Sequence, residues 1–260
     1  MVRMRHFGHS SLGRAAAFLI AAALVLTSAG AAGMKAEAKG ADGETVIVLD
    51  PGHSAVSGDL GAQYPPYNEG QMTLELAQYI AGELSQYDNV KVYLTRTDGA
   101  DPTLAQRVET AHQLGADFLC CLHYNAYGDG SRNGAEVHVS ANPALFPAEA
   151  YFAQTELNEL ENAGLSVRGI KYRIGKNGQD YYGIIRRATA YGMQSVIIEH
   201  CYLDGPEDRR FLAQKDAVSK LGHADALALA KHLHLKSSAY GVDFSNYEET
   251  SITYPVGPFD

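Results

Sequence analysis

The feature that most restricts the fold of this chain is a buried strand that ends in a histidine. Val46–Leu49 is a continuous run of β-branched and aliphatic residues, which is typical of a strand buried on both faces. We expect the strand to stop after it, because Pro51 cannot extend a central ladder and Gly52 allows the backbone angles of a turn. His53 is then delivered at the carboxyl end of the strand, where open α/β sheets place their sites.

Two further apolar runs end in the same way. Asp117–Leu122 is followed by His123, and Ser195–Ile198 is followed by Glu199. Between the strands, apolar residues recur at helical spacing, and this alternation predicts a single α/β domain with a mostly parallel, twisted sheet and helices on both faces. Right-handed crossovers bring the strand ends to one edge of such a sheet, so His53, His123 and Glu199 are expected to share that edge.

The other elements follow from apolar spacing and from signals at their ends. Glu69 opens an amphipathic helix, a position where the helix dipole alone already favours a carboxylate. Thr103 is expected to cap the next helix and Gly115 to stop it. We expect further helices over Ala150–Asn162 (with a solvated acidic face), from Pro206, and over Asp216–His234, further strands at Val90–Leu94 and Glu136–Ser140, and irregular surface at 54–68 and 166–183.

The first 38 residues have the layout of a secretory signal peptide. Arg3, Arg5 and Arg14 precede an apolar run over Ala15–Leu26, and small residues fit a cleavage site between 31 and 38. The apolar run is shorter than the roughly 20 residues that span a bilayer, which favours cleavage over the alternative of a retained anchor. We therefore expect a secreted or cell-wall protein without stable membrane insertion after cleavage.

The rest of the chain is predicted to be one catalytic domain at 45–235 and an acidic, tyrosine-rich tail at 236–260, expected to be flexible. A hydrophobic content of 46% allows a full core, so Cys120, Cys121 and Cys201 are interpreted as buried free thiols, with a Cys121–Cys201 bridge as the alternative. The net charge of −9 argues against a nucleic-acid partner. A monomer is the default expectation.

The residues at the predicted edge suit metal-assisted hydrolysis. Two histidines and one carboxylate, with a position left for water, are a common catalytic zinc set. Zinc lowers the pKa of bound water to about 7, and a second carboxylate can carry the proton to a leaving amine. Glu69 and Glu199 are both available as carboxylates. The sequence contains no His-Glu-x-x-His motif, so the ligands must come from separate segments, and spacing alone leaves their roles open.

A series of short motifs carries more specific information. In order they are Leu49-Asp50-Pro51-Gly52-His53, Asn68-Glu69, Leu94-Thr95-Arg96-Thr97, Gln106-Arg107-Val108, Ala116-Asp117, His123-Tyr124-Asn125, Gly134-Ala135-Glu136-Val137, Val196-Ile197-Ile198-Glu199 and Gly205-Pro206-Glu207-Asp208. Together they resemble the zinc-dependent N-acetylmuramoyl-L-alanine amidases of the type 3 family. The resemblance runs from about Thr45 to His234.

The resemblance implies that His53, Glu69 and His123 bind Zn²⁺ and that Glu199 is the catalytic general base and acid. The implied substrate is peptidoglycan, cut at the amide bond between N-acetylmuramic acid and L-alanine of the stem peptide. Asp50 would then be a turn or supporting residue rather than a ligand. Asn125 and Arg186 are candidate substrate contacts, since an arginine can hold a stem-peptide carboxylate.

The chain also departs from the family pattern. Ser54-Ala55 stands where glycines commonly follow the first histidine, and His200-Cys201-Tyr202-Leu203-Asp204 replaces the usual small or apolar pair and Ser-Asn turn. His200 is expected to point to the opposite face of its strand from Glu199. Two alternatives remain open: a zinc peptidase or other amide hydrolase with a different substrate, and a non-catalytic wall-binding relative.

Overall fold

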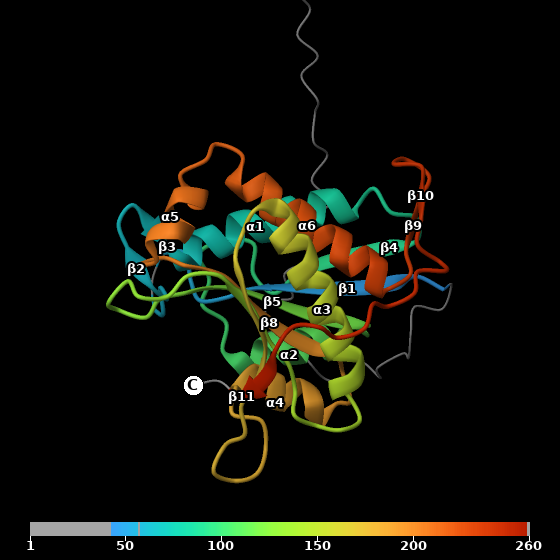
Figure 1. Ribbon diagram of the computed structural model, residues 1–260. Helices are drawn as coiled ribbons and strands as arrows, with labels where there is room; N and C mark the ends of the chain where they lie inside the picture. The colour runs from blue at the N-terminus through green and yellow to red at the C-terminus, as the bar shows by residue number, and fades with distance from the viewer. Residues whose placement is uncertain (1–42, 57, 259–260) are drawn as a thin grey trace, which may run out of the picture.

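A seven-stranded sheet forms the centre of the protein (Figure 1). The computed structural model describes residues 43–56 and 58–258, so the predicted signal segment lies outside the described residues. The strand order is β11-β7-β6-β8-β5-β1-β4, and of these neighbours only β6 and β8 run antiparallel. The strands are β1 (Thr45–Pro51), β4 (Val90–Leu94), β5 (Phe118–Asn125), β6 (Ala135–His138), β7 (Val167–Tyr172), β8 (Ser195–Tyr202) and β11 (Val256–Pro258).

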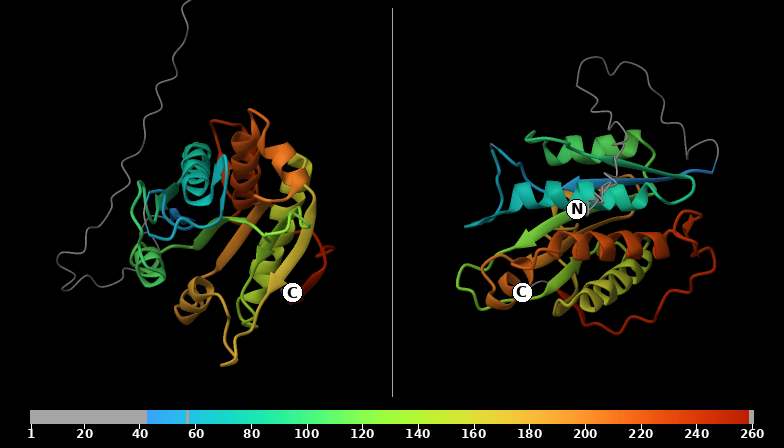
Figure 2. Two further views of the ribbon diagram at one scale, coloured as in Figure 1. Left: turned by 90° about the vertical axis from the view of Figure 1, so that its left-hand side faces the viewer. Right: turned by 90° about the horizontal axis from the view of Figure 1, so that it is seen from above.

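Helices cover both faces of this sheet, as predicted (Figures 1 and 2). On one face lie α1 (Glu69–Leu84), α3 (Phe146–Ala163) and α6 (Ala217–His232), whose buried side chains share a core cluster with one side of the strands. On the other lie α2 (Leu104–Gln113) and α4 (Gly183–Ala190), which form a second, smaller cluster with the alternate strand residues. The short helix α5 (Pro206–Leu212) packs beside β8 and α6.

The first strand is longer than its sequence suggests. Asp50 and Pro51 continue to pair with Cys121 and Leu122 of β5, whereas pairing with β4 ends at Leu49. Pro51 therefore stops only one of the two ladders: it lacks the N–H that the β4 side would need next, while Gly52 still donates to Leu122 on the β5 side. The strand thus carries the chain right up to His53.

β7 and α4 are among the elements that were not predicted. Val167–Tyr172 forms β7, although Arg168, Gly169 and Lys171 make it read as a polar surface segment. Gly183–Ala190 forms α4, a helix of only 8 residues that is too short to show a clear periodicity. The region 54–68 also contains a small ribbon of β2 (Gln63–Tyr64) and β3 (Tyr67–Asn68).

The acidic face expected on α3 is solvated only in part, because Glu161 is exposed whereas Glu156 is buried. Glu149 and Glu156 are both 0% exposed, because α3 is enclosed by the sheet, by α6 and by the C-terminal segment. Helical spacing marks which residues share a face of a helix, but it does not say how many faces the fold covers.

The C-terminal segment is not irregular throughout. It forms a ribbon of β9 (Lys236–Ser237) and β10 (Val242–Asp243), and β11 then pairs in parallel with β7 at the edge of the main sheet. Within the described part of the chain, no helix combines the length and apolar character needed to cross a membrane. All three cysteines are free and buried, as interpreted from the sequence.

Candidate active site

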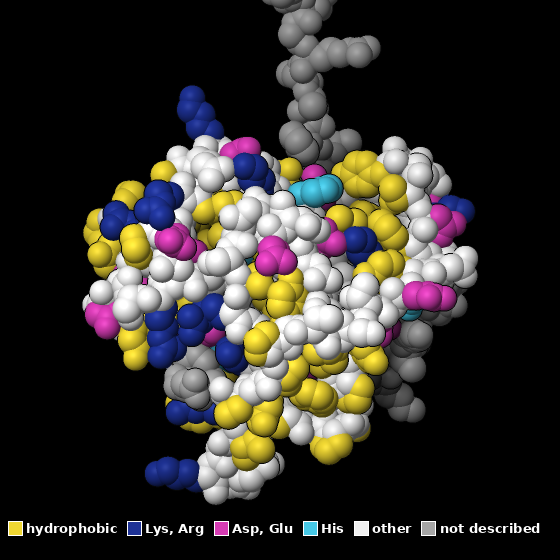
Figure 3. Space-filling view, in the orientation of Figure 1, with side chains coloured by type: hydrophobic (Ala, Val, Ile, Leu, Met, Phe, Trp, Pro, Cys, Tyr) yellow, Lys and Arg dark blue, Asp and Glu magenta, His cyan; other side chains and the backbone are white. Residues whose placement is uncertain are grey.

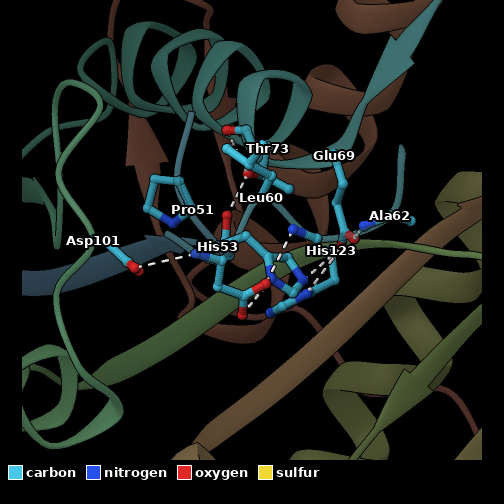
Figure 4. Close-up of polar contacts among 12 residues, drawn as sticks. Pro51, His53, Leu60, Ala62, Glu69, Thr73, Asp101 and His123 are labelled. Carbon is cyan, nitrogen blue, oxygen red and sulfur yellow. Dashed lines mark hydrogen bonds and ion pairs between the residues drawn. The ribbon is translucent and has the colours of Figure 1, made fainter. Parts of the chain in front are cut away.

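Three side chains from separate elements converge at the carboxyl edge of the sheet (Figure 4). His53 follows β1, Glu69 is the first residue of α1, and His123 lies in β5. The Nε2 atom of His53 and the Nδ1 atom of His123 each lie 3.1 Å from the same oxygen of Glu69, Oε1. One nitrogen from each ring and one carboxylate oxygen all lie within 4.8 Å of one another, a donor set that suits zinc.

The turn that presents His53 differs from the expected one. The residue in the left-handed region is His53 itself, with φ of 61°, and not Gly52. Gly52 is needed for space instead, because a Cβ atom there would lie 2.4 Å from Cε1 of the His123 ring. The two histidine rings meet edge to face, with centroids 4.8 Å apart.

Two buried arginines stabilise this turn by donating hydrogen bonds to its backbone carbonyls. Arg107 donates to the backbone carbonyls of Pro51 and His53, at 2.8 Å each, and to Asp50 at 2.8 Å. Arg96 donates to the carbonyls of Pro51 and Gly52, at 2.9 Å each. Asp50 also accepts a short hydrogen bond from Thr95. Its carboxylate therefore anchors Arg107, which in turn fixes the backbone of His53.

Glu69 is oriented by backbone donors. The N–H of Ala62 donates to Oε2 at 2.7 Å, and the N–H of Tyr124 donates to Oε1 at 3.0 Å. The carboxyl group is buried, which opposes ionisation, but the hydrogen bonds and charges of His123 and His53 outweigh burial and hold its pKa far below the ordinary value. Asn68 caps α1 by accepting from the N–H of Gln71, so the helix start is locked as well.

Asp59 is a supporting residue that was not predicted from the sequence. Its Oδ2 atom lies 3.0 Å from Nδ1 of His53, on the side of the ring away from Glu69. Burial lowers the pKa of His53, but Glu69 and then Asp59 raise it by more, so the net shift is upward. The only hint in the sequence is an acidic residue between two glycines, Gly58 and Gly61, in a loop without periodicity.

Glu199 stands beside this group on the neighbouring strand. It pairs with His123 across the β5–β8 ladder, and both side chains point to the face covered by α2 and α4. Its Oε2 atom is buried and has no hydrogen-bond partner among the described residues. Burial first, and then the negative charges of Glu69 and Glu136, raise the pKa of Glu199 well above the ordinary value. Such a carboxyl group readily holds a proton.

The two candidate substrate contacts both make hydrogen bonds within the protein. Asn125 ends β5 and donates to Glu136 at 3.2 Å, one strand away from Glu199. Arg186 donates to the carbonyls of Asp180 and Tyr181, at 2.7 and 2.8 Å, and so braces the loop before α4. A cleft of about 220 Å³ opens beside the cluster, and its lining includes His53, Asp59, Thr103, Leu104, His123 and Ile184.

Cationic and aromatic side chains gather near the same end of the molecule. Figure 3 shows Lys and Arg side chains together at the left of that face, the side toward which the carboxyl end of β1 points in Figure 1. Several arginines lie over tyrosine rings: Arg209 over Tyr64, with 4.9 Å to the ring centroid, and Arg132 over Tyr127 with 3.8 Å. Such pairs present flat apolar rings and positive charge together.

Comparison with known proteins identifies the family. The model of the N-acetylmuramoyl-L-alanine amidase family, Amidase_3, matches residues 47–231. The chain is 29% identical to the N-acetylmuramoyl-L-alanine amidase CwlM of Bacillus licheniformis over 196 residues, covering 74% of this chain and 71% of that protein. It is 32% identical to AmiA of Escherichia coli over 138 residues, covering 53% of this chain and 45% of AmiA.

A solved structure agrees with these matches. The catalytic domain of CwlV, an N-acetylmuramoyl-L-alanine amidase from Paenibacillus polymyxa, superposes with a TM-score of 0.62 at 27% identity, covering 73% of this chain and 98% of that domain. With the fold, the cluster at the sheet edge and these matches in agreement, the chain belongs to the type 3 family of N-acetylmuramoyl-L-alanine amidases.

Proposed function

We propose that the protein is an exported zinc amidase that cuts peptidoglycan between N-acetylmuramic acid and L-alanine of the stem peptide. The observation that carries the proposal is the convergence of His53, Glu69 and His123 next to the unpartnered carboxylate oxygen of Glu199. The family match supports amidase chemistry on the cell wall. The export signal expected at 1–38 supports a location outside the membrane or in the cell wall.

The donor set fits a zinc ion held by His53, Glu69 and His123. Asp59 on the outer nitrogen of His53 matches the usual second contact of a metal-binding histidine, which fixes the ring orientation. When bound, zinc would polarise the scissile carbonyl and lower the pKa of water at the site. The chain itself supplies the orientation of the ligands through Arg96, Arg107 and the Ala62 and Tyr124 N–H groups.

Glu199 is the group that moves the proton. Its carboxylate takes a proton from the attacking water as the water oxygen bonds to the lactyl carbonyl carbon. It then gives that proton to the alanine nitrogen as the carbon–nitrogen bond breaks. The free lactyl acid and the free amine of the stem peptide are the products. The position of Glu199 directly across the ladder from His123 supports this role.

The decisive experiment replaces Glu199 with Gln. Because general acid–base catalysis contributes typically about 10²–10⁴-fold, we expect Glu199→Gln to release stem peptides from purified peptidoglycan more slowly by about that factor. Zinc content, measured by mass spectrometry of the purified chain, should match the parent. Loss of the zinc held by His53 and His123 in the variant would make Glu199 a ligand and not the proton carrier.

A second assay separates the proposal from its alternatives. Release of L-alanine-terminated stem peptides from muropeptides, without cleavage of plain peptides of the same sequence, is the expected result. Cleavage of the plain peptides would instead identify a zinc peptidase. A parent protein that holds no zinc at the edge site and cuts neither substrate would be a wall-binding relative.

A further inference from the structure

A second group of metal-binding residue types lies inside the core, away from the active site. It consists of Glu156 of α3, His200 of β8 and Asp225 of α6. All three are 0% exposed. A donor atom from each lies within 4.8 Å of the donor atoms of the others, the same closeness as in the active-site cluster.

The buried cluster and the side chain of Glu199 lie on opposite faces of β8. Glu199 points toward α2 and α4, while the next residue, His200, points toward α6, where its Nε2 atom lies 3.0 Å from Asp225. The Nδ1 atom of His200 lies 3.0 Å from the backbone carbonyl oxygen of His123. A hydrogen bond therefore links the buried cluster to the backbone of an active-site residue.

The hydrogen bond to His123 decides which ring nitrogen of His200 carries a proton. A carbonyl oxygen can only accept, so Nδ1 must be the donor. In the neutral ring, Nε2 then presents a lone pair toward the oxygens of Asp225. A backbone carbonyl on one ring nitrogen and a free lone pair on the other is the arrangement by which proteins prepare a histidine to bind a metal.

The side chain of Glu156 is a second reason to expect a bound cation in this cluster. Both of its carboxylate oxygens are buried and lack a hydrogen-bond partner among the described residues, although they lie at the cluster. The neighbouring residues of α3 and α6, including Phe152, Leu157 and Leu229, belong to the apolar core. Two ionised carboxylates in such surroundings are costly, so their charge must be neutralised, either by protons or by a bound cation.

We propose that Glu156, His200 and Asp225 form a second, structural site for a divalent cation. One divalent cation balances the charge of the two carboxylates, and it gives the Glu156 oxygens and the His200 lone pair a common partner. An imidazole nitrogen among the donors favours zinc or a similar transition metal over magnesium or calcium. The cation would tie α3 and α6 to β8 and, through His200, steady the backbone of His123.

Zinc is the probe for this site, and the full-length chain is the test protein. The double variant Glu156→Gln/Asp225→Asn keeps the side-chain shapes but removes both charges of the buried cluster. The variant His53→Ala/Glu69→Gln removes the active-site cluster. Glu161→Gln, an exposed residue of the same helix α3, is the matched control. Each protein is loaded with zinc and desalted, and its zinc is counted by mass spectrometry.

We expect two zinc ions per chain in the parent and the control, and one in each of the other two variants. We also expect added zinc to raise the Tm of His53→Ala/Glu69→Gln. One zinc in the parent, one in Glu156→Gln/Asp225→Asn and none in His53→Ala/Glu69→Gln would overturn the proposal and show a pair of carboxyl groups neutralised by protons. One zinc in the parent, none in Glu156→Gln/Asp225→Asn and one in His53→Ala/Glu69→Gln would support the buried site and reject zinc binding at the active site.

The parent alone gives an independent answer if the double variant does not fold. Crystals of the parent grown with zinc are examined by anomalous diffraction at the zinc absorption edge. A peak between Glu156, His200 and Asp225 supports the buried site. An ordered core without a peak there overturns it, whatever is found at His53 and His123.

Discussion

At the scale of single residues, the active site depends on a backbone that is held against its own preference. His53 adopts a left-handed conformation with φ of 61°, which costs an ordinary residue roughly 1–2 kcal/mol. Arg107 offsets this cost through its hydrogen bond to the His53 carbonyl, and Gly52 leaves room for the His123 ring. On the outer side of the ring, the Asp59 carboxylate lies 3.0 Å from Nδ1.

Replacing Asp59 with Asn tests the support of His53. The substitution keeps the size of the side chain but removes the charge that faces Nδ1. We expect zinc to bind about tenfold more weakly, at the lower end of the usual effect because Asp59 is largely exposed. Competition with a chromophoric chelator measures the affinity, with the remote surface change Asp243→Asn as control. Equal affinities for Asp59→Asn and the parent would mean that Asp59 does not orient the ring.

At the scale of elements, one buried carboxylate connects α3 with two strands. Glu149, in the first turn of α3, accepts from the N–H of Ser140 just after β6, at 2.6 Å, and from the N–H of Ser195 at the start of β8, at 2.9 Å. These strands are antiparallel neighbours. Burial raises the pKa of Glu149 to about 7 despite both hydrogen bonds.

Replacing Glu149 with Gln should destabilise the protein in a manner that depends on pH. An amide nitrogen cannot accept, so one buried N–H loses its partner, and the free energy of unfolding should fall by about 1–3 kcal/mol at acidic pH. In the parent, the folded state binds the Glu149 proton more tightly than the unfolded state, so stability is lost as the pH rises from about 4.5 to 7. The glutamine of the variant does not titrate, so the variant does not lose stability in this way as the pH rises.

The free energies of unfolding of the parent and of Glu149→Gln should therefore become more similar as the pH rises from about 4.5 to 7. Urea unfolding of both proteins at several pH values measures it. A difference that stays constant or widens toward neutral pH would show that Glu149 is ionised throughout.

At the scale of the whole molecule, the C-terminal segment closes one edge of the sheet. β11 pairs with β7, and the side-chain carbonyl of Gln154 in α3 accepts from the N–H groups of Thr253 and Tyr254, at 2.8 and 3.1 Å. The segment lies at the far edge from β1 and β4, so it contributes to the integrity of the sheet and not to the cluster at His53.

Ending the chain at Ile252 should separate stability from catalysis. Removal of β11 exposes the unpaired edge of β7 and takes both N–H donors from the Gln154 carbonyl oxygen, so we expect a lower Tm and a stronger tendency to aggregate, as measured by thermal unfolding and light scattering. At a temperature where the shortened chain remains folded, its rate on peptidoglycan should equal that of the parent. A loss of rate without a loss of stability would place the segment at the active site.

Local sequence pattern was sufficient to predict the strands and the helix that carry the candidate site residues. The apolar runs before His53, His123 and Glu199, and the helical spacing after Glu69, reflect short-range rules of strand and helix formation, and the edge rule of parallel sheets placed their ends together. The same rules failed at β7 and α4, because a strand that contains Arg168, Gly169 and Lys171 and a helix of 8 residues show little apolar periodicity.

What the sequence by itself determined is the identity and order of the chemical groups at the sheet edge, since each follows directly from a local pattern or motif. Only the tertiary structure decided the surroundings of those groups. It brought Asp59 to His53 and Arg107 to the turn, and it buried Glu156 against His200 and Asp225. The physical reason is that contacts between distant segments, and the number of covered faces of a helix, depend on how complete elements pack, which no local window of residues contains.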